Sequence, residues 1–226
     1  MDLLKYQWAR HTDDVNLTNR SQLRRLSDRG SHEEADLYRI LDAAFLAHVG
    51  FVADGQPFVI PTLFGREGNT LYLHGSAASR MMRELETGIA VCVTVTLVDG
   101  LVLARSAFHH SMNYRSVVAF GTARKLAGDS DKNHALKVIS DHLIRGRWED
   151  VRPPAPKELK GTTVLAMEIE EASAKVRTGG PKDDAEDYAL PVWAGVLPLR
   201  TVAQAPEPDG EQACEVPGYI VNFGCC

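Results

Sequence analysis

Two Asp-Gly pairs, each placed between runs of apolar residues, constrain the fold of this chain more than any other feature. Asp54-Gly55 separates residues 46–53 from 57–64, and Asp99-Gly100 separates residues 89–98 from 101–106. Asp-Gly favours the tight turn of a β-hairpin, because its central residues need positive φ. Tight hairpins imply antiparallel pairing, since parallel strands need long crossovers. The chain is therefore expected to form an antiparallel sheet rather than a doubly wound one.

The remaining patterns add strands and a few helices around this sheet. Residues 89–98 alternate, with Val91, Val93 and Val95 on one face. Further strands are expected over residues 70–74, 114–126, 162–169, 173–177, 192–199 and 219–223. Helices are expected over residues 35–45, 75–85 and 130–145, with an acidic short helix or turn at 181–188 and a proline-rich link at 153–156. The prediction is a mainly β fold, a six- to seven-stranded antiparallel barrel with peripheral helices, forming one domain over residues 31–226 after an arm at 1–30.

Charge and hydropathy exclude several classes of function. The 226 residues carry a net charge of -5 without a basic stripe, so no nucleic-acid partner is expected. No run of about 18 apolar residues suggests a membrane span, and the first ten residues lack the apolar stretch of a signal peptide. A cytoplasmic protein is expected. Cys92 lies in an apolar strand, and Cys225 and Cys226 lack zinc-ligand spacing, so no metal site is predicted.

The stretch 71–80 is the most informative block for chemistry. An apolar strand leads into Gly75-Ser76 and then into an expected helix that carries Ser79 and Arg80. Free N–H groups at a helix N-terminus, a hydroxyl and a guanidinium together suit a phosphate. The alternative is that Ser76 is only an N-cap and Arg80 a surface residue. The P-loop and dinucleotide-binding patterns are absent, which disfavours a nucleoside triphosphatase or a Rossmann enzyme.

Two further blocks carry polar and aromatic groups. Residues 108–116 include His109 and His110, which would point to opposite faces of a strand, and Asn113 and Arg115, which would share a face. Residues 192–199 contain Trp193, either as part of a hydrophobic plug or as a wall against a planar ring. No Ser/His/Asp or Cys/His nucleophile pattern can be assigned, so the catalytic residues are unknown.

These blocks, in this order, resemble the pyridoxamine 5′-phosphate oxidase-related family, and most closely its branch that includes nitroimidazole-resistance proteins. The matching stretches are 58–62, 71–80, 113–121 and 193–198, within residues 35–200. The resemblance implies an FMN-binding split β-barrel and a homodimer with two FMN molecules at its interface. Arg80 stands where the family more often has Lys, and it keeps the charge. The implied cofactor-binding residues are Ile60, Pro61 and Thr62 at the ring, His74, Gly75, Ser79 and Arg80 at the phosphate, and Ser111, Asn113, Arg115 and Trp193 around the same cofactor.

The resemblance implies an FMN-dependent oxidoreductase that acts on a small molecule, with NADH or NADPH as a plausible electron donor. The arginine-rich phosphate strand of the classical oxidase is not found, so oxidation of pyridoxamine phosphate itself is not predicted. A flavin-binding or sensing module without turnover remains open. Haem binding through His74, His109 or His110 is another alternative, and a deazaflavin cofactor is a lesser one.

Overall fold

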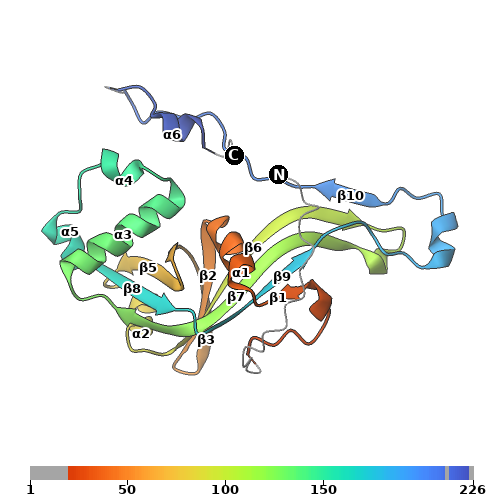
Figure 1. Cartoon of the computed structure of the whole chain (residues 1–226), viewed down its shortest axis with the longest axis horizontal. Helices are drawn as coiled ribbons and strands as arrows, with labels where there is room; N and C mark the ends of the chain where they lie inside the picture. The colour runs from red at the N-terminus through yellow and green to blue at the C-terminus, as the bar shows by residue number, and fades with distance from the viewer. Residues whose placement is uncertain (1–19, 212–213, 224–226) are drawn as a thin grey trace. The chain divides into compact units, whose positions relative to one another are not determined.

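The computed structural model describes residues 20–211 and 214–223. Ten strands lie in this part of the chain, and all the pairings given below are antiparallel. Seven of the strands have seven or more residues, which matches the predicted number, and β1, β4 and β10 are shorter. The strands are β1 (Gly30–Ser31), β2 (Leu46–Ala53), β3 (Gln56–Leu63), β4 (Gly65–Glu67), β5 (Thr70–Ser76), β6 (Ala90–Leu103), β7 (Ser111–Lys125), β8 (Thr162–Glu168), β9 (Glu171–Arg177) and β10 (Gly195–Pro198) (Figure 1).

Six α-helices accompany the strands in the described residues. They are α1 (Glu34–Asp42), α2 (Arg80–Leu85), α3 (Asp129–Leu143), α4 (Arg147–Asp150), α5 (Pro156–Gly161) and α6 (Gly218–Val221), and 3₁₀ turns occupy Ser27–Arg29, Ala107–His109 and Ala185–Ala189. None of the helices in the described part of the chain combines the length and the apolar character needed to cross a bilayer. Most of the predicted arm at 1–30, together with Cys225 and Cys226, lies outside the described residues.

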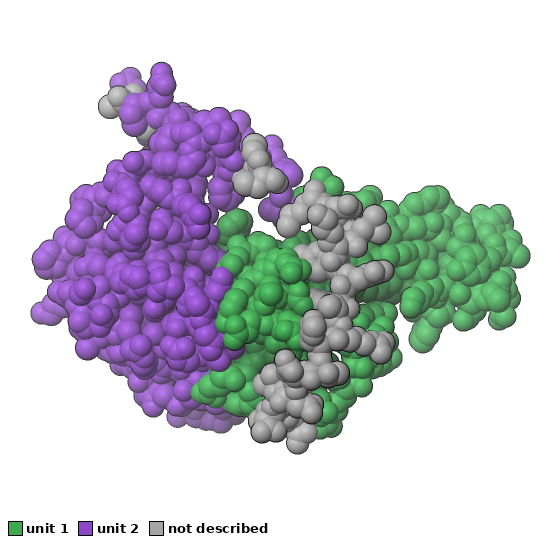
Figure 2. Space-filling model, in the orientation of Figure 1, with its two compact units in different colours: residues 1–48, 92–120, 170–200 green, residues 49–91, 121–169, 201–226 purple. Residues whose placement is uncertain are grey.

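The chain divides into two compact units that alternate along the sequence (Figure 2). Unit 1 comprises residues 1–48, 92–120 and 170–200, and unit 2 comprises residues 49–91, 121–169 and 201–226. The expectation of a single domain over residues 31–226 stays a prediction.

Unit 1 is built on the strand order β10-β6-β7-β9-β1. β7 pairs with β9 from Tyr114 opposite Arg177 to Phe120 opposite Glu171. α1 lies against β9 and buries Leu37, Ile40 and Leu41, the apolar face that its sequence spacing indicated.

Unit 2 contains most of the hairpin of β2 and β3 and a second set of neighbours, in which the end of β7 is followed by β8, β5 and β4. Asp54 and Gly55 have φ of 50° and 74°, which confirms the first predicted hairpin turn. β5 pairs with β8 along its whole length, from Thr70 opposite Glu168 to Ser76 opposite Thr162. α3 lies against β4, β5 and β8, and α2 and α5 also contact β8. α3 covers the face of β5 that carries Tyr72, whereas Met82 of α2 lies against Gly75 on the opposite face.

The second predicted hairpin is wrong. Asp99 and Gly100 lie inside the continuous strand β6, and the chain reverses later, through the 3₁₀ turn at Ala107–His109. Gly100 pairs with Pro198 of β10, and a Cβ on Gly100 would lie 3.0 Å from the carbonyl oxygen of Leu197. Here the glycine permits a close approach of two backbones instead of a turn.

Three other expected elements differ from the structure. The helix expected from Gly75 begins only at Arg80, because β5 continues to Ser76 to complete its pairing with β8. The strand expected over 192–199 is limited to β10, Gly195–Pro198. Residues 219–223 were expected to form a strand, but Gly218–Val221 is a short helix after Pro217, whose fixed φ suits a helix start.

Candidate functional site

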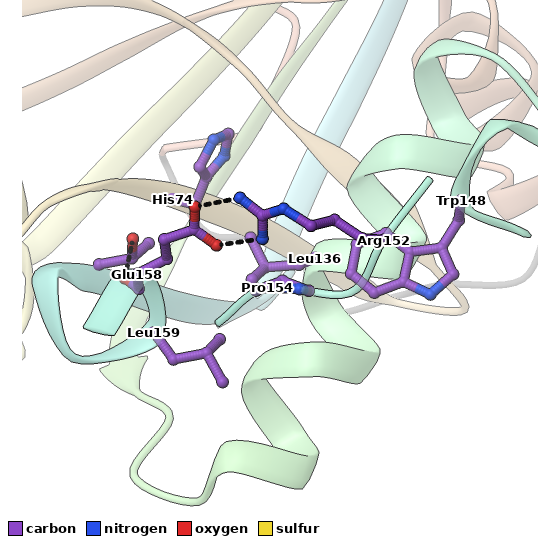
Figure 3. Close-up of a pocket in the computed structure, with 8 residues that line it drawn as sticks. His74, Leu136, Trp148, Arg152, Pro154, Glu158 and Leu159 are labelled. Carbon is purple, nitrogen blue, oxygen red and sulfur yellow. Dashed lines mark hydrogen bonds and ion pairs between the residues drawn. The ribbon is translucent and has the colours of Figure 1, made fainter. Parts of the chain in front are cut away.

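The site with the clearest geometry is a cavity of about 420 Å³ inside unit 2. It lies where β5 and β8 meet the helical segment 136–161, and its volume falls within the range of small-molecule and cofactor sites. Four apolar residues, Leu136, Trp148, Pro154 and Leu159, form much of its wall. The lining is completed by His74, Arg152, Glu158 and Thr162 (Figure 3).

His74 reaches the cavity because of the alternation of β5. Leu71 and Leu73 are fully buried on one face of the strand, whereas Tyr72 and His74 point to the opposite face. Tyr72 packs against a buried cluster that includes Val164 and Ala166 of β8. The strand therefore carries His74 to the same helix-covered side of the sheet.

The imidazole of His74 is half-buried and has no hydrogen-bond partner among the described residues. Its Nδ1 atom is buried and has no hydrogen-bond partner among the described residues. Desolvation by burial lowers the pKa of His74 below its ordinary value, so the ring is neutral at pH 7. A neutral imidazole with an unpartnered ring nitrogen is the state that ligates a metal centre.

A bidentate ion pair between Arg152 and Glu158 lies at the same cavity. Glu158 Oε1 accepts from Nη2 of Arg152 at 2.6 Å, and Oε2 accepts from Nη1 at 2.8 Å. Oε2 also accepts from the backbone N–H of Ala155 at 2.7 Å, at the start of α5. These bonds, led by those from Arg152, lower the pKa of Glu158 to about 2, so the pair is ionic at neutral pH. Both side chains are at least half exposed, which places the pair at the rim of the cavity.

The predicted phosphate and ring residues also lie in unit 2, on β3 and in the turn between β5 and α2. Ile60 and Pro61 are exposed on β3, Thr62 is half-buried there, and β3 contacts β5. Gly75 packs closely against Met82 of α2, since a Cβ on Gly75 would lie 3.1 Å from Cε of Met82.

Arg80 does not extend freely from the turn that follows β5. Its guanidinium carbon sits 5.0 Å from the ring centroid of Phe58 on β3, as in a cation–π contact. Ser79 is the N-cap of α2, but its side chain makes no capping hydrogen bond. The structure thus brings these residues into one unit, while their role in binding a cofactor stays a prediction.

Two of the other predicted cofactor residues, Asn113 and Arg115, lie in unit 1 and have protein partners. Asn113 is buried in β7, donates to the carbonyl of Gly179 at 3.1 Å and accepts from the guanidinium of Arg177. Arg115 donates to both carboxylate oxygens of Asp99, at 2.7 and 2.9 Å. Both side chains therefore stabilise unit 1.

Ser111 and Trp193, the remaining two cofactor candidates, are exposed in unit 1, Trp193 with 67% of its surface accessible. The other two histidines considered as haem ligands, His109 and His110, also lie in this unit and have partners. Nε2 of His109 is 3.3 Å from Asp184, and Nδ1 of His110 accepts from the backbone N–H of Ala104 at 3.0 Å. Of the three candidate haem ligands, only His74 keeps a buried ring nitrogen without a partner in the described part of the chain.

Sequence reasoning did not find the walls of the cavity. Trp148, Arg152, Glu158 and Leu159 come from a segment interpreted only as the end of a helix and a proline-rich link. One signal was present in the sequence, since Pro156 stands at the first position of the helix and Glu158 lies in its first turn. That pattern predicts a helix start but gives no indication of a cavity.

Comparison with known proteins fits this architecture. The family model described as pyridoxamine 5′-phosphate oxidase matches residues 33–176. Together with the antiparallel fold, this confirms the predicted split-barrel class. The chain belongs to the pyridoxamine 5′-phosphate oxidase family.

Three solved structures are informative. The flavocytochrome Anf3 from Azotobacter vinelandii is 44% identical, with a TM-score of 0.85 over 91% of this chain and 97% of that one. An FAD and heme binding protein from Mycobacterium smegmatis is 38% identical, with a TM-score of 0.80. The match covers 86% of this chain and 96% of that one. A putative 5-nitroimidazole antibiotic resistance protein from Bacteroides thetaiotaomicron is 25% identical, with a TM-score of 0.56. The match covers 65% of this chain and 86% of that one. The comparison with curated proteins gave no match.

Proposed function

We propose that this chain is a flavoprotein oxidoreductase that also binds haem, with His74 as the axial ligand. The observation that carries the haem part is the neutral, unpartnered imidazole of His74 in a cavity with largely apolar walls. The similarity to a flavocytochrome and to an FAD and heme binding protein supports the same reading.

The residues around the cavity suit a haem. His74 would hold the iron, since imidazole is a common axial ligand. Leu136, Trp148, Pro154 and Leu159 would contact the apolar porphyrin faces and exclude water. Bound haem supplies one-electron and oxygen chemistry, while the protein provides the ligand, the orientation and the dry surroundings.

The flavin part of the proposal uses the residues expected from the sequence. Ile60, Pro61 and Thr62 would line the ring, and Gly75, Ser79 and Arg80 would hold the phosphate. FMN is the flavin that the sequence resemblance implies, whereas a relative with 38% identity is an FAD and heme binding protein. Chromatography and mass measurement of the flavin released by denaturation distinguish the two, and a released deazaflavin would displace both.

We also propose a homodimer in the cytoplasm, in which Ser111, Asn113, Arg115 and Trp193 approach the flavin and NADH or NADPH donates electrons to it. Light scattering after gel filtration tests the dimer, and a clean monomer would remove the shared flavin site. Reduction of the bound flavin by either nicotinamide, followed by its reoxidation by oxygen or a nitro compound, separates an oxidoreductase from a module that binds flavin without turnover.

The absorption spectrum of the purified protein is the primary test of the haem proposal. A Soret band together with flavin bands is expected for the wild type. His74→Ala should lose the Soret band and retain the flavin bands. His74 is also expected beside the flavin phosphate, but Gly75, Ser79 and Arg80, which are proposed to hold the phosphate, are unchanged in this variant. His109→Ala, which removes a histidine paired with Asp184 in unit 1, is the matched control and should keep both sets of bands. An unchanged Soret band in His74→Ala would refute the ligand assignment.

A further inference from the structure

Arg152 lines the His74 cavity, and its ion pair with Glu158 leaves part of its guanidinium free to bind another group. The guanidinium lines the cavity, and the paired carboxylate of Glu158 lines it too. Figure 3 shows the two dashed contacts that join these groups. An exposed ion pair of this kind contributes little to stability. Its position at the rim instead suits the binding of a ligand in the cavity.

Glu158 uses only one of the two binding edges of the guanidinium. Its carboxylate accepts from Nη1 and Nη2, which form the end-on fork of the arginine. Nη1 donates in addition to the carbonyl oxygen of Pro153 at 3.1 Å. An arginine has five N–H donors in a fixed planar arrangement. The Nε–H and the second N–H of Nη2, which point in parallel along the side of the plane, therefore have no partner among the residues that the structure describes.

The side chain is held in place by bonds that do not occupy this side edge. The backbone N–H of Ala155 donates to the carboxylate of Glu158, so the group that pairs with Arg152 is itself held at the start of α5. A guanidinium that is already oriented loses less conformational entropy when it binds a second carboxylate. Side-on pairing of arginine with a carboxylate is bidentate and charge-assisted, which gives it direction as well as energy.

We propose that the side edge of Arg152, its Nε–H and Nη2–H, binds a carboxylate carried by the planar ligand of the His74 cavity, and that Glu158 is the positioning residue for this contact. The inference rests on the proposed function, since it takes that ligand to be an iron porphyrin with carboxylate side chains. With the iron at His74 and a carboxylate at Arg152, the ligand is fixed at two points, which selects one of its orientations in the plane.

The test separates the carboxylate from the rest of the ligand. Full-length protein produced without haem is titrated with iron(III) protoporphyrin IX and, separately, with its dimethyl ester, both delivered in the same detergent, and Kd is followed at the Soret band. The wild type should bind the free acid about three- to tenfold more tightly than the ester, a modest factor because the arginine is solvent-exposed. Arg152→Ala should lose this preference by weakening only the binding of the acid, and Arg152→Lys should restore part of it.

Arg147→Ala is the control, because this arginine lies on α4, bonds to Tyr219 and does not line the cavity. It should keep the preference for the acid. If Arg152→Ala weakened the binding of the acid and of the ester equally, Arg152 would only support the local fold. If the variant bound both compounds as the wild type does, Arg152 would not contact the ligand. Either result overturns the inference. A wild-type protein that takes up neither compound would overturn the proposed function, and this inference with it.

Discussion

Replacement of His74 by leucine is expected to make the haem-free protein more stable while it abolishes haem binding. In the structure Nδ1 of His74 is buried without a hydrogen-bond partner among the described residues. A buried polar atom left without a partner costs about 1–3 kcal/mol. Leucine has a comparable size, carries no polar atom, and would face the apolar side chains of Leu136 and Leu159.

The magnitude follows from the partial exposure of the histidine and the size of the chain. Because His74 is half-buried, the gain in the free energy of unfolding should lie near the lower part of that range, about 1–2 kcal/mol. For a chain of 150–250 residues, each kcal/mol shifts Tm by about 2–4 °C, so Tm should rise by about 2–8 °C.

The gain should also depend on pH. Burial lowers the pKa of His74 in the folded state below its unfolded value near 6.5, so the unfolded chain takes up a proton more readily. The wild type should therefore lose stability as the pH falls below about 6.5, towards the lowered folded pKa. His74→Leu lacks this term, so its advantage should be larger at pH 5.5 than at pH 7.5.

Urea unfolding of the haem-free proteins, followed by far-ultraviolet circular dichroism at both pH values, measures these differences. His48→Leu is the matched control, because His48 also lies on a strand, β2, but is exposed, and its substitution should change stability little at either pH. If His74→Leu were less stable than the wild type at both pH values, or if the gap did not widen at pH 5.5, the account of a buried neutral imidazole kept for a ligand would fail.

Two further substitutions test the packing of the units. Gly121→Ala should destabilise the protein by about 3 kcal/mol in urea unfolding, because its Cβ would lie 2.2 Å from the carbonyl oxygen of Glu168. Gly161→Ala is the control and should change stability little, because the space around Gly161 is open. Similar unfolding curves for the two variants would contradict this. Asp183→Ala removes the acceptor of the backbone N–H and the guanidinium of Arg105, and faster amide hydrogen exchange over residues 181–190 is expected by mass spectrometry, with unchanged exchange as the contrary result.

Most of the strands were predictable because their signals are local. The alternation of β6 and the positive φ of Asp54 and Gly55 follow from short-range sterics that the sequence displays directly. Asp99-Gly100 carries the same turn signal but lies inside the continuous strand β6. Asp99 binds Arg115 and Gly100 faces β10, and these tertiary contacts outweigh the local preference.

The site was predictable only in part. His74 was named from its place at the end of an apolar strand, both as a cofactor neighbour and as a haem candidate. Its distinguishing property, a buried nitrogen without a partner among the described residues, depends on α3 and on the segment 147–161, which line the same cavity. Residues 136–162 are more than 60 positions away in the chain, so no spacing in the sequence relates them to His74.

The origin of the cavity walls suggests how a shared sheet can serve different ligands. Five of the eight lining residues, Trp148, Arg152, Pro154, Glu158 and Leu159, belong to the connection between α3 and β8, whereas the strands supply only His74 and Thr162. The sheet fixes the position of the imidazole through the pairing of His74 with Val164, and the connection supplies the apolar surface and the charged rim. Connections tolerate change more readily than paired strands do. A relative with the same β5 and β8 but a different connection would keep the histidine's position and lose the cavity. Under the proposed function, the segment 147–161, rather than the sheet, would therefore decide whether haem binds in this unit.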